Sequence, residues 1–289
     1  MAPARIALVA LSLLLVACSA TKFAVANLAA KTEPAARTAD LAYGPEPRQR
    51  LDVYTPRTRH GSAAVPVVMF VHGGGWDAGS KDLYKFVGTS LAARGYVAVL
   101  PNYRLFPQVR FPTFVEDAAL AVAWTRTHAA EFGGDGHRLF LMGHSAGAHI
   151  VMLLALDAHY LERVGLDGRA IRGVIGLSGP YDFLPFGLGF QHAVFDASAD
   201  LELTQPVHFA RGDAPPVLLL YGSKDKVVAP RNSESLAAAL RAAGGHVTLK
   251  RYPGRSHEDT VAAFSDLKRH RAPVRDDVDS FVTSVLESH

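Results

Sequence analysis

The chain has 289 residues, of which 49% are hydrophobic and 20% are charged, with 25 glycines, 17 prolines and one cysteine. This composition excludes a collagen-like or intrinsically disordered chain, and a single cysteine excludes an intrachain disulfide framework. The formal charge is only +3, from 30 basic and 27 acidic side chains. Because no basic stripe is interleaved with aromatic residues, a nucleic-acid partner is not expected.

The N-terminus has the pattern of a secretory signal. Arg5 precedes an apolar run from Ile6 to Ala17, which is shorter than the ~20 residues that a membrane-spanning helix needs. The run ends in Leu15-Val16-Ala17-Cys18, which resembles the lipobox of bacterial lipoproteins. That resemblance implies cleavage before Cys18 and attachment of lipid to it, and therefore a membrane-bound protein of the bacterial cell envelope, outside the cytoplasm. An ordinary signal peptide that happens to end near a cysteine is the alternative.

Three segments follow from this interpretation. Residues 1–17 are expected to be the signal peptide, and residues 18–40, which show no strong periodicity, are expected to be a lipid-anchored tether. Residues 41–289 are expected to form one catalytic domain, because no further linker and no internal repeat interrupts them.

After residue 40, short apolar segments alternate with segments of helical periodicity. Most of the apolar segments lack polar residues, which is typical of central strands in a parallel sheet covered on both faces. Strands are expected near 49–54, 65–71, 96–100, 139–142, 174–177, 217–221 and 246–252, and helices near 82–94, 113–131, 146–158, 231–243 and 272–287. This alternation predicts a doubly wound, mostly parallel α/β sheet.

The run Gly143-His144-Ser145-Ala146-Gly147 lies directly between a predicted strand and a predicted helix. A serine between two such glycines is the nucleophile-elbow pattern, in which a tight strained turn exposes the hydroxyl. The glycines are needed because side chains two residues from the serine would crowd the bend. Ser145 is therefore the candidate nucleophile.

A second glycine-rich run, His72-Gly73-Gly74-Gly75-Trp76, follows another predicted strand. Glycines let backbone N–H groups approach the oxygen that becomes negatively charged during acyl transfer. Gly74 and Gly75 are the preferred donors of this oxyanion hole, with Gly73 as an alternative, and Ala146 is expected to supply another N–H. His72 is interpreted as a residue that braces the loop rather than as a base.

Asp225 and His257 follow the last two predicted strands, where ligand sites of open α/β sheets lie. The order Ser145, Asp225, His257 is that of the α/β-hydrolase triad. Asp182 also follows a strand and is the competing acid. The other histidines considered as the base are assigned structural or solvated roles: His149, His246, His270 and His289.

Together these residues resemble the α/β-hydrolase superfamily, from about residue 41 to the C-terminus. The similarity is to bacterial H-G-G-G-W carboxylesterases related to feruloyl and acetyl-xylan esterases and to kynurenine formamidases. The resemblance implies the α/β-hydrolase fold, with Ser145 as nucleophile, Asp225 as acid and His257 as base. Further matching pieces are Leu51-Asp52-Val53-Tyr54, Asn102-Tyr103-Arg104-Leu105, Phe111-Pro112 and Asp117.

The expected activity is hydrolysis of small or medium carboxylic esters through an acyl-serine intermediate, without metal or organic cofactor. Activity should rise through pH ~6–7, because the base must be neutral to take the serine proton. An amidase acting on an N-formyl substrate, or a catalytically silent binding scaffold, are the alternatives. The irregular segment 183–212 is rich in phenylalanine, and is interpreted either as an acyl pocket or cap or as a loop packed on the core.

Overall fold

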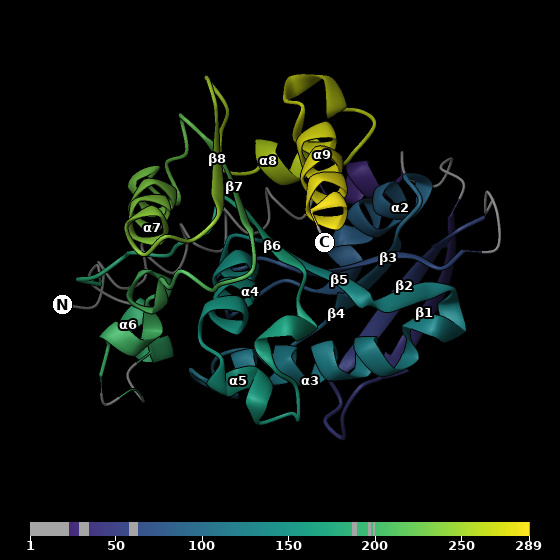
Figure 1. Cartoon of the computed structure of the whole chain (residues 1–289), viewed down its shortest axis with the longest axis horizontal. Coiled ribbons are helices and arrows are strands. Elements are labelled where there is room, and N and C mark those ends of the chain that lie inside the picture. The colour runs from purple at the N-terminus through teal and green to yellow at the C-terminus, as the bar shows by residue number, and fades with distance from the viewer. Residues whose placement is uncertain are drawn as a thin grey trace, which may run out of the picture.

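The computed structural model describes residues 23–28, 35–57, 63–186, 190–195, 198 and 200–288. Its sheet has eight strands in the order β1-β2-β4-β3-β5-β6-β7-β8 (Figure 1). β1 and β2 pair in antiparallel fashion, as do β2 and β4, and the other neighbours are parallel. The strands are β1 Ala35–Ala42, β2 Arg50–Pro56, β3 Val65–Val71, β4 Val97–Pro101, β5 Gly134–His144, β6 Gly173–Leu177, β7 Val217–Gly222 and β8 Val247–Tyr252.

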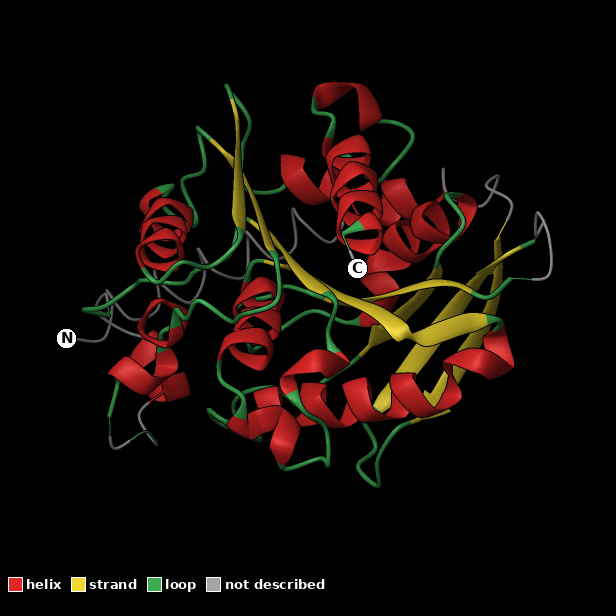
Figure 2. Cartoon of the chain, viewed as in Figure 1, coloured by secondary structure: helices red, strands yellow, loops and turns green. Residues whose placement is uncertain are grey.

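Helices cover both faces of this twisted sheet (Figure 2). Residues 23–28 are helical, and the other helices longer than four residues are α2 Lys85–Ala93, α3 Thr113–His128, α4 Ala146–Leu156, α6 Phe190–Phe195, α7 Arg231–Ala242 and α9 Val274–Glu287. The shorter ones are η2 Lys81–Tyr84, η3 Ala129–Phe132, α5 His159–Glu162, η4 Gly168–Ala170, η5 Glu202–Thr204, η6 Pro206–Phe209, α8 Asp259–Ala262 and η7 Arg269–Arg271. None of the helices in the described ranges is long and apolar enough to cross a membrane.

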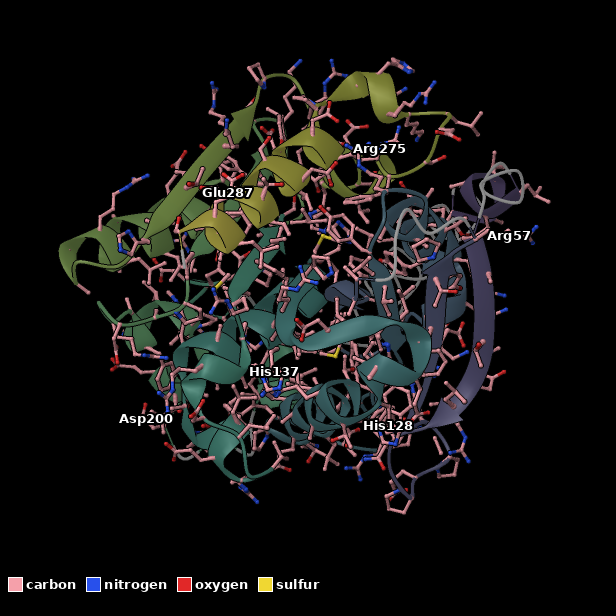
Figure 3. All side chains as sticks on the ribbon, turned by 45° about the vertical axis from the view of Figure 1, so that its right-hand side comes forward. Arg57, His128, His137, Asp200, Arg275 and Glu287 are labelled. Atoms are coloured by element: carbon pink, nitrogen blue, oxygen red, sulfur yellow. The ribbon has the colours of Figure 1, made fainter. Side chains whose placement is uncertain are left out.

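The two faces of the sheet carry separate cores because side chains alternate along each strand. In β3, Val67, Met69 and Val71 pack into the core under α3, α4 and α7. Val68 and Phe70 point the other way, into the core under α2, α8 and α9. Figure 3 labels Arg275 and Glu287 near the two ends of α9, the helix that closes this second face. The predicted doubly wound α/β fold is confirmed.

The candidate site lies where the neighbouring strands β3 and β5 end. β3 and β5 are neighbours, and Val71 at the end of β3 is in register with Gly143 near the end of β5. β3 leads into the glycine loop 72–76, whereas β5 leads into Ser145 and α4. Parallel strands bring their carboxyl ends to one edge of the sheet, so the two motifs lie side by side.

The predicted tether is wrong in the part of it that the structure describes. Residues 35–40 belong to β1 and hydrogen-bond to β2, so the sheet begins before residue 41. Residues 23–28 are helical, and Phe23 and Ala26 are buried against the core under α2 and α9. The predicted signal peptide 1–17 and the predicted lipidation site Cys18 lie outside the described residues.

Candidate active site

Ser145 occupies the sharp turn between β5 and α4. Its backbone angles, φ 55° and ψ −122°, are strained for a residue other than glycine, and its N–H donates to the Leu177 carbonyl at 2.9 Å. A Cβ at Gly143 would lie 2.3 Å from the Gly147 carbonyl oxygen, and one at Gly147 would lie 2.1 Å from the Val71 oxygen. The turn therefore requires both glycines of the predicted elbow, and it presents Ser145 at the carboxyl edge of the sheet.

The glycine loop after β3 lies against this elbow. A Cβ at Gly73 would lie 3.1 Å from Ser145 Cβ, so the two backbones almost touch. Gly74, Gly75 and Trp76 follow with φ angles of 127°, 62° and 66°. Within the described chain, the N–H groups of Gly74 and Gly75 donate to no backbone carbonyl.

Ala146 begins α4, and the first N–H of a helix has no acceptor within that helix. Gly73, which precedes the predicted donors Gly74 and Gly75, packs against Ser145, and the predicted donor Ala146 follows Ser145 directly. An oxygen that gains negative charge there can accept hydrogen bonds from these predicted donors.

His257 and Asp225 form a hydrogen-bonded pair just beyond the ends of β8 and β7. His257 Nδ1 lies 2.8 Å from Asp225 Oδ2, and each residue is 7% exposed. The second carboxylate oxygen, Oδ1, accepts hydrogen bonds from the N–H groups of Val227 and Val228 at 2.9 and 2.8 Å. Of the two candidate acids, Asp225 rather than Asp182 therefore has the geometry that the triad needs.

The pKa of the Asp225 carboxyl lies below its usual value. Burial acts to raise this pKa, but the hydrogen bond and charge of His257 outweigh it, together with the two backbone N–H groups. A carboxylate that stays ionised can hold the His257 Nδ1–H in place and stabilise the ring when it becomes positively charged.

His144, the residue before Ser145, connects the elbow to His257. Its Nε2 lies 3.2 Å from the His257 carbonyl oxygen, and the two imidazole rings are 4.8 Å apart between centroids. The structure therefore brings Ser145, His257 and Asp225, which are far apart in the sequence, to one edge of the sheet.

His72 braces the glycine loop, as predicted. Its Nδ1 lies 2.8 Å from the Gly73 carbonyl oxygen, and its ring stacks on Tyr103 at 4.4 Å. Burial lowers the pKa of His72 to about 3, so the ring is neutral at physiological pH. His149 is also structural: it is fully buried, and its Nε2 lies 2.8 Å from the Thr204 carbonyl oxygen.

The described residues of the segment 183–212 pack beside the glycine loop. Trp76 stacks on Phe183 at 5.9 Å and meets Phe195 of α6 edge to face at 5.0 Å. Phe186 and Phe195 are buried in the core under α3 and α4. These described residues are thus packed on the core and contact Trp76, the last residue of the glycine loop.

Tyr84, at the end of η2, is a residue near the site that the sequence did not point to. Its hydroxyl lies 3.4 Å from His144 Nδ1, and its ring packs within 6.2 Å of His72. The predicted helix 82–94 contained Tyr84, but nothing in its spacing marked this contact. Among the described residues, no cluster of His, Cys, Asp or Glu has the composition to hold a metal ion.

Comparison with known proteins identifies the family. The sequence profile of the BD-FAE family matches residues 51–240. The chain belongs to the BD-FAE family. This family consists of α/β-hydrolase esterases, so the predicted superfamily is confirmed. The matched range contains Ser145, Asp225 and the glycine loop.

Curated relatives of this BD-FAE chain include esterases of plants and bacteria. Isoprenylcysteine alpha-carbonyl methylesterase ICME of Arabidopsis thaliana is 32% identical over 240 residues, which cover 76% of this chain and 56% of the plant protein. Esterase LipC of Mycobacterium tuberculosis is 30% identical over 239 residues, which cover 75% of this chain and 58% of LipC. The chain thus spans little more than half the length of these relatives.

Solved structures support the BD-FAE assignment at the level of the fold. The C6-C4 SN3 inhibited esterase B from Lactobacillus rhamnosis superimposes with a TM-score of 0.80 at 21% identity, covering 96% of this chain and 97% of that protein. The apo form of Thermogutta terrifontis esterase 2 superimposes with a TM-score of 0.70 at 22% identity, covering 87% and 95% of the two chains.

Proposed function

We propose that this protein hydrolyses carboxylic esters through an acyl intermediate on Ser145. The observation that carries the proposal is the 2.8 Å pair between His257 and Asp225, which lies beside the strained turn of Ser145. The names of the two curated relatives described above, a methylesterase and an esterase, support the same chemistry.

In the first half of the reaction, His257 Nε2 takes the proton of Ser145 Oγ, and Oγ attacks the ester carbonyl carbon. The carbonyl oxygen becomes an oxyanion that accepts hydrogen bonds from the N–H groups of Gly74, Gly75 and Ala146. The tetrahedral intermediate then expels the alcohol, which takes the proton from His257. Ser145 is left as an ester of the acyl group.

In the second half, water attacks the acyl carbon while His257 accepts its proton. The new intermediate breaks the bond to Ser145 Oγ, which recovers the proton, and the carboxylic acid leaves. Throughout, the Asp225 carboxylate accepts the His257 Nδ1–H. The two backbone hydrogen bonds from Val227 and Val228 fix the direction of that carboxylate.

The substrates that we infer are esters with small or medium acyl groups. Trp76 follows the oxyanion glycines directly, and Phe183 stacks on its ring. Two aromatic side chains at this position limit the space beside the acyl carbon. An N-formyl amide would use the same residues, and a comparison of p-nitrophenyl acetate with N-formylkynurenine separates the two reactions.

The proposal is tested by substituting the nucleophile. Ser145→Ala should lower kcat on the order of 10³-fold or more, because residues of a triad act as a unit. A fluorophosphonate should label the wild-type protein on the peptide that contains 143–147, and it should not label the variant. Ser90→Ala is the matched control, since Ser90 is a buried serine of α2 that lies away from the site.

Two results would contradict the proposal. A wild-type protein that neither labels with fluorophosphonate nor cleaves any p-nitrophenyl ester between acetate and octanoate is a silent scaffold. Equal activity of Ser145→Ala and Ser90→Ala would show that another residue performs the reaction.

We further propose that Cys18 carries lipid and holds the enzyme on a membrane of the cell envelope. Support comes from the lipobox-like sequence before Cys18 and from an apolar surface that includes residues 23–28. On that surface Val25, Leu28 and Leu267 are 50%, 63% and 53% exposed, and Val25 and Leu267 line the same apolar cavity of about 240 Å³. Cys18→Ala should move the protein from the membrane to the soluble fraction, and a variant that stays membrane-bound would contradict the proposal.

A further inference from the structure

We propose that Tyr84 and His144 form a hydrogen-bonded relay that positions His257 relative to Ser145 and the oxyanion loop. The inference rests on the proposed ester hydrolysis, in which His257 is the base. Tyr84 and His144 would be positioning residues, since they contact the base and the loop rather than the substrate.

The direction of each hydrogen bond in the relay follows from the groups present. His144 Nε2 lies 3.2 Å from the His257 carbonyl oxygen, which can only accept, so Nε2 carries the proton. In a neutral ring Nδ1 is then an acceptor, and the Tyr84 hydroxyl, 3.4 Å away, donates to it. A Cβ at Gly73 would lie 3.1 Å from His144 Nδ1, so the His144 ring also packs against the glycine loop. The relay therefore runs from Tyr84 through His144 to the main chain of His257.

Both members of the relay are buried deeply enough to keep these protonation states. Burial and the neighbouring His257 together lower the pKa of His144 to about 3, so the His144 ring is neutral at physiological pH. Burial likewise raises the pKa of the Tyr84 hydroxyl above its usual value. A neutral His144 can donate and accept at the same time, which a charged one cannot.

The aromatic surroundings hold the relay in one geometry. The Tyr84 ring packs on Phe23 at 5.0 Å, on Phe70 of β3 at 5.4 Å and on Phe86 of α2 at 6.1 Å. His144 is the residue immediately before the nucleophile. A shift of Tyr84 or His144 would thus be transmitted to Ser145, the oxyanion loop and His257 together, and displacements of about 1 Å can cost on the order of 10²-fold in rate.

The central test compares two replacements of His144 that fill similar space. His144→Gln keeps an N–H near the position of Nε2, so it can still donate to the His257 carbonyl, whereas His144→Met cannot. We expect His144→Met to lower kcat for p-nitrophenyl butyrate by about 10- to 100-fold with KM changed less than about twofold. His144→Gln should restore kcat to within about threefold of the wild type.

Tyr84 gives an independent variant. Tyr84→Phe should lower kcat several-fold in the wild-type background, but it should have little additional effect in His144→Gln, which has no Nδ1 for the hydroxyl to reach. Such non-additivity measures the coupling between the two residues. Tyr96→Phe is the matched control, because it removes a phenol hydroxyl that bonds Asp279 away from the site.

Rates are to be expressed per active site titrated with fluorophosphonate, and the Tm of each variant measured beside them. Equal kcat values for His144→Gln and His144→Met would overturn the relay. Additive effects of Tyr84→Phe and His144→Gln on kcat would also overturn it. If His144→Met does not fold, the double-mutant cycle of Tyr84→Phe and His144→Gln tests the proposal by itself. These outcomes leave labelling of the wild-type Ser145 intact, so they differ from a failure of the proposed function, in which no labelling occurs.

Discussion

At the scale of single residues, Trp76 connects the glycine loop 72–76 to Phe183 and Phe195. It adopts φ 66°, which is unusual for a tryptophan, so the loop holds the ring in a defined position. The ring is 5% exposed and is packed between Phe183 and Phe195. Phe183 is only partly buried, which makes it the member of this group most open to an entering acyl chain.

Phe183→Ala is predicted to extend the range of acyl groups that the enzyme accepts. Removal of the ring frees space beside Trp76, so kcat/KM for octanoate relative to acetate should rise several-fold, since each added methylene that enters an apolar pocket contributes up to about 1 kcal/mol. A series of p-nitrophenyl esters from acetate to octanoate measures the change. Phe281→Ala, on the opposite face of the sheet, should leave the dependence of kcat/KM on acyl length unaltered. An unaltered dependence in Phe183→Ala would contradict the assignment of Phe183 to the acyl pocket.

The sequence was enough to predict the residues that directly follow strands. Ser145 lies between two glycines after the buried strand β5, and Asp225 and His257 follow β7 and β8 of the same parallel part of the sheet, so topology brings them to one edge. The contacts of Tyr84 with His144, and of His144 with His257, depend on side-chain packing between residues 60 and 113 positions apart. No local pattern encodes such contacts, and the structure was needed to find them.

At the scale of elements, the edge strand β1 is held by charges as well as by its hydrogen bonds to β2. Asp52 of β2 is fully buried, and Lys81 of η2 is 2% exposed. Asp52 pairs with Arg37 of β1 at 2.6 Å and with Lys81 at 2.9 Å, and Lys81 also reaches Asp40 of β1 at 2.7 Å. Lys81 therefore ties β1 and β2 to the start of α2.

This mode of attachment explains why β1 was not predicted. Most of its side chains are exposed, and its sequence, with alanines, Arg37, Thr38 and Asp40, lacks the apolar run of a central strand. β3, in contrast, is buried along most of its length and was predicted with its observed bounds. Besides Asp52 of β2, a charged partner that orders β1 is Lys81 of η2, which lies 41 residues after Asp40 in the chain.

Lys81→Met is predicted to destabilise the protein by about 3 kcal/mol, because it removes one cationic partner of a buried carboxylate. Urea unfolding measures this loss. Hydrogen exchange should show that Lys81→Met accelerates exchange of the β1 amides more than exchange of the β3 amides. Lys85→Met is the control, since Lys85 forms a surface pair with Asp82 at 2.8 Å and is 37% exposed, so that its loss should cost less than about 1 kcal/mol. Equal effects of the two variants would contradict a special role for Lys81.

At the scale of the whole molecule, three neutral histidines are buried in and around the site. Burial lowers the pKa of His72 and of His144 to about 3 and that of His149 to about 4. In the unfolded chain the same side chains titrate near 6.5. Between these values the unfolded state binds more protons than the folded state, so the free energy of unfolding must rise with pH in this range and level off above about 6.5.

We therefore predict that the protein loses stability as the pH falls from 7 to 5, by up to about 2 kcal/mol for each of the three histidines. Carboxylates with a lowered pKa, such as Asp225 and Asp259, lose their stabilising effect only below this pH range, since unfolded aspartates titrate near 3.9.

Urea unfolding at half-unit pH steps measures the slope of the free energy of unfolding against pH. His149→Gln keeps a donor for the Thr204 carbonyl but cannot titrate, so it should reduce the slope by about one third, whereas the exposed His270→Gln should leave it unchanged. A slope that is the same in wild type and His149→Gln would show that His149 is not held neutral by the fold.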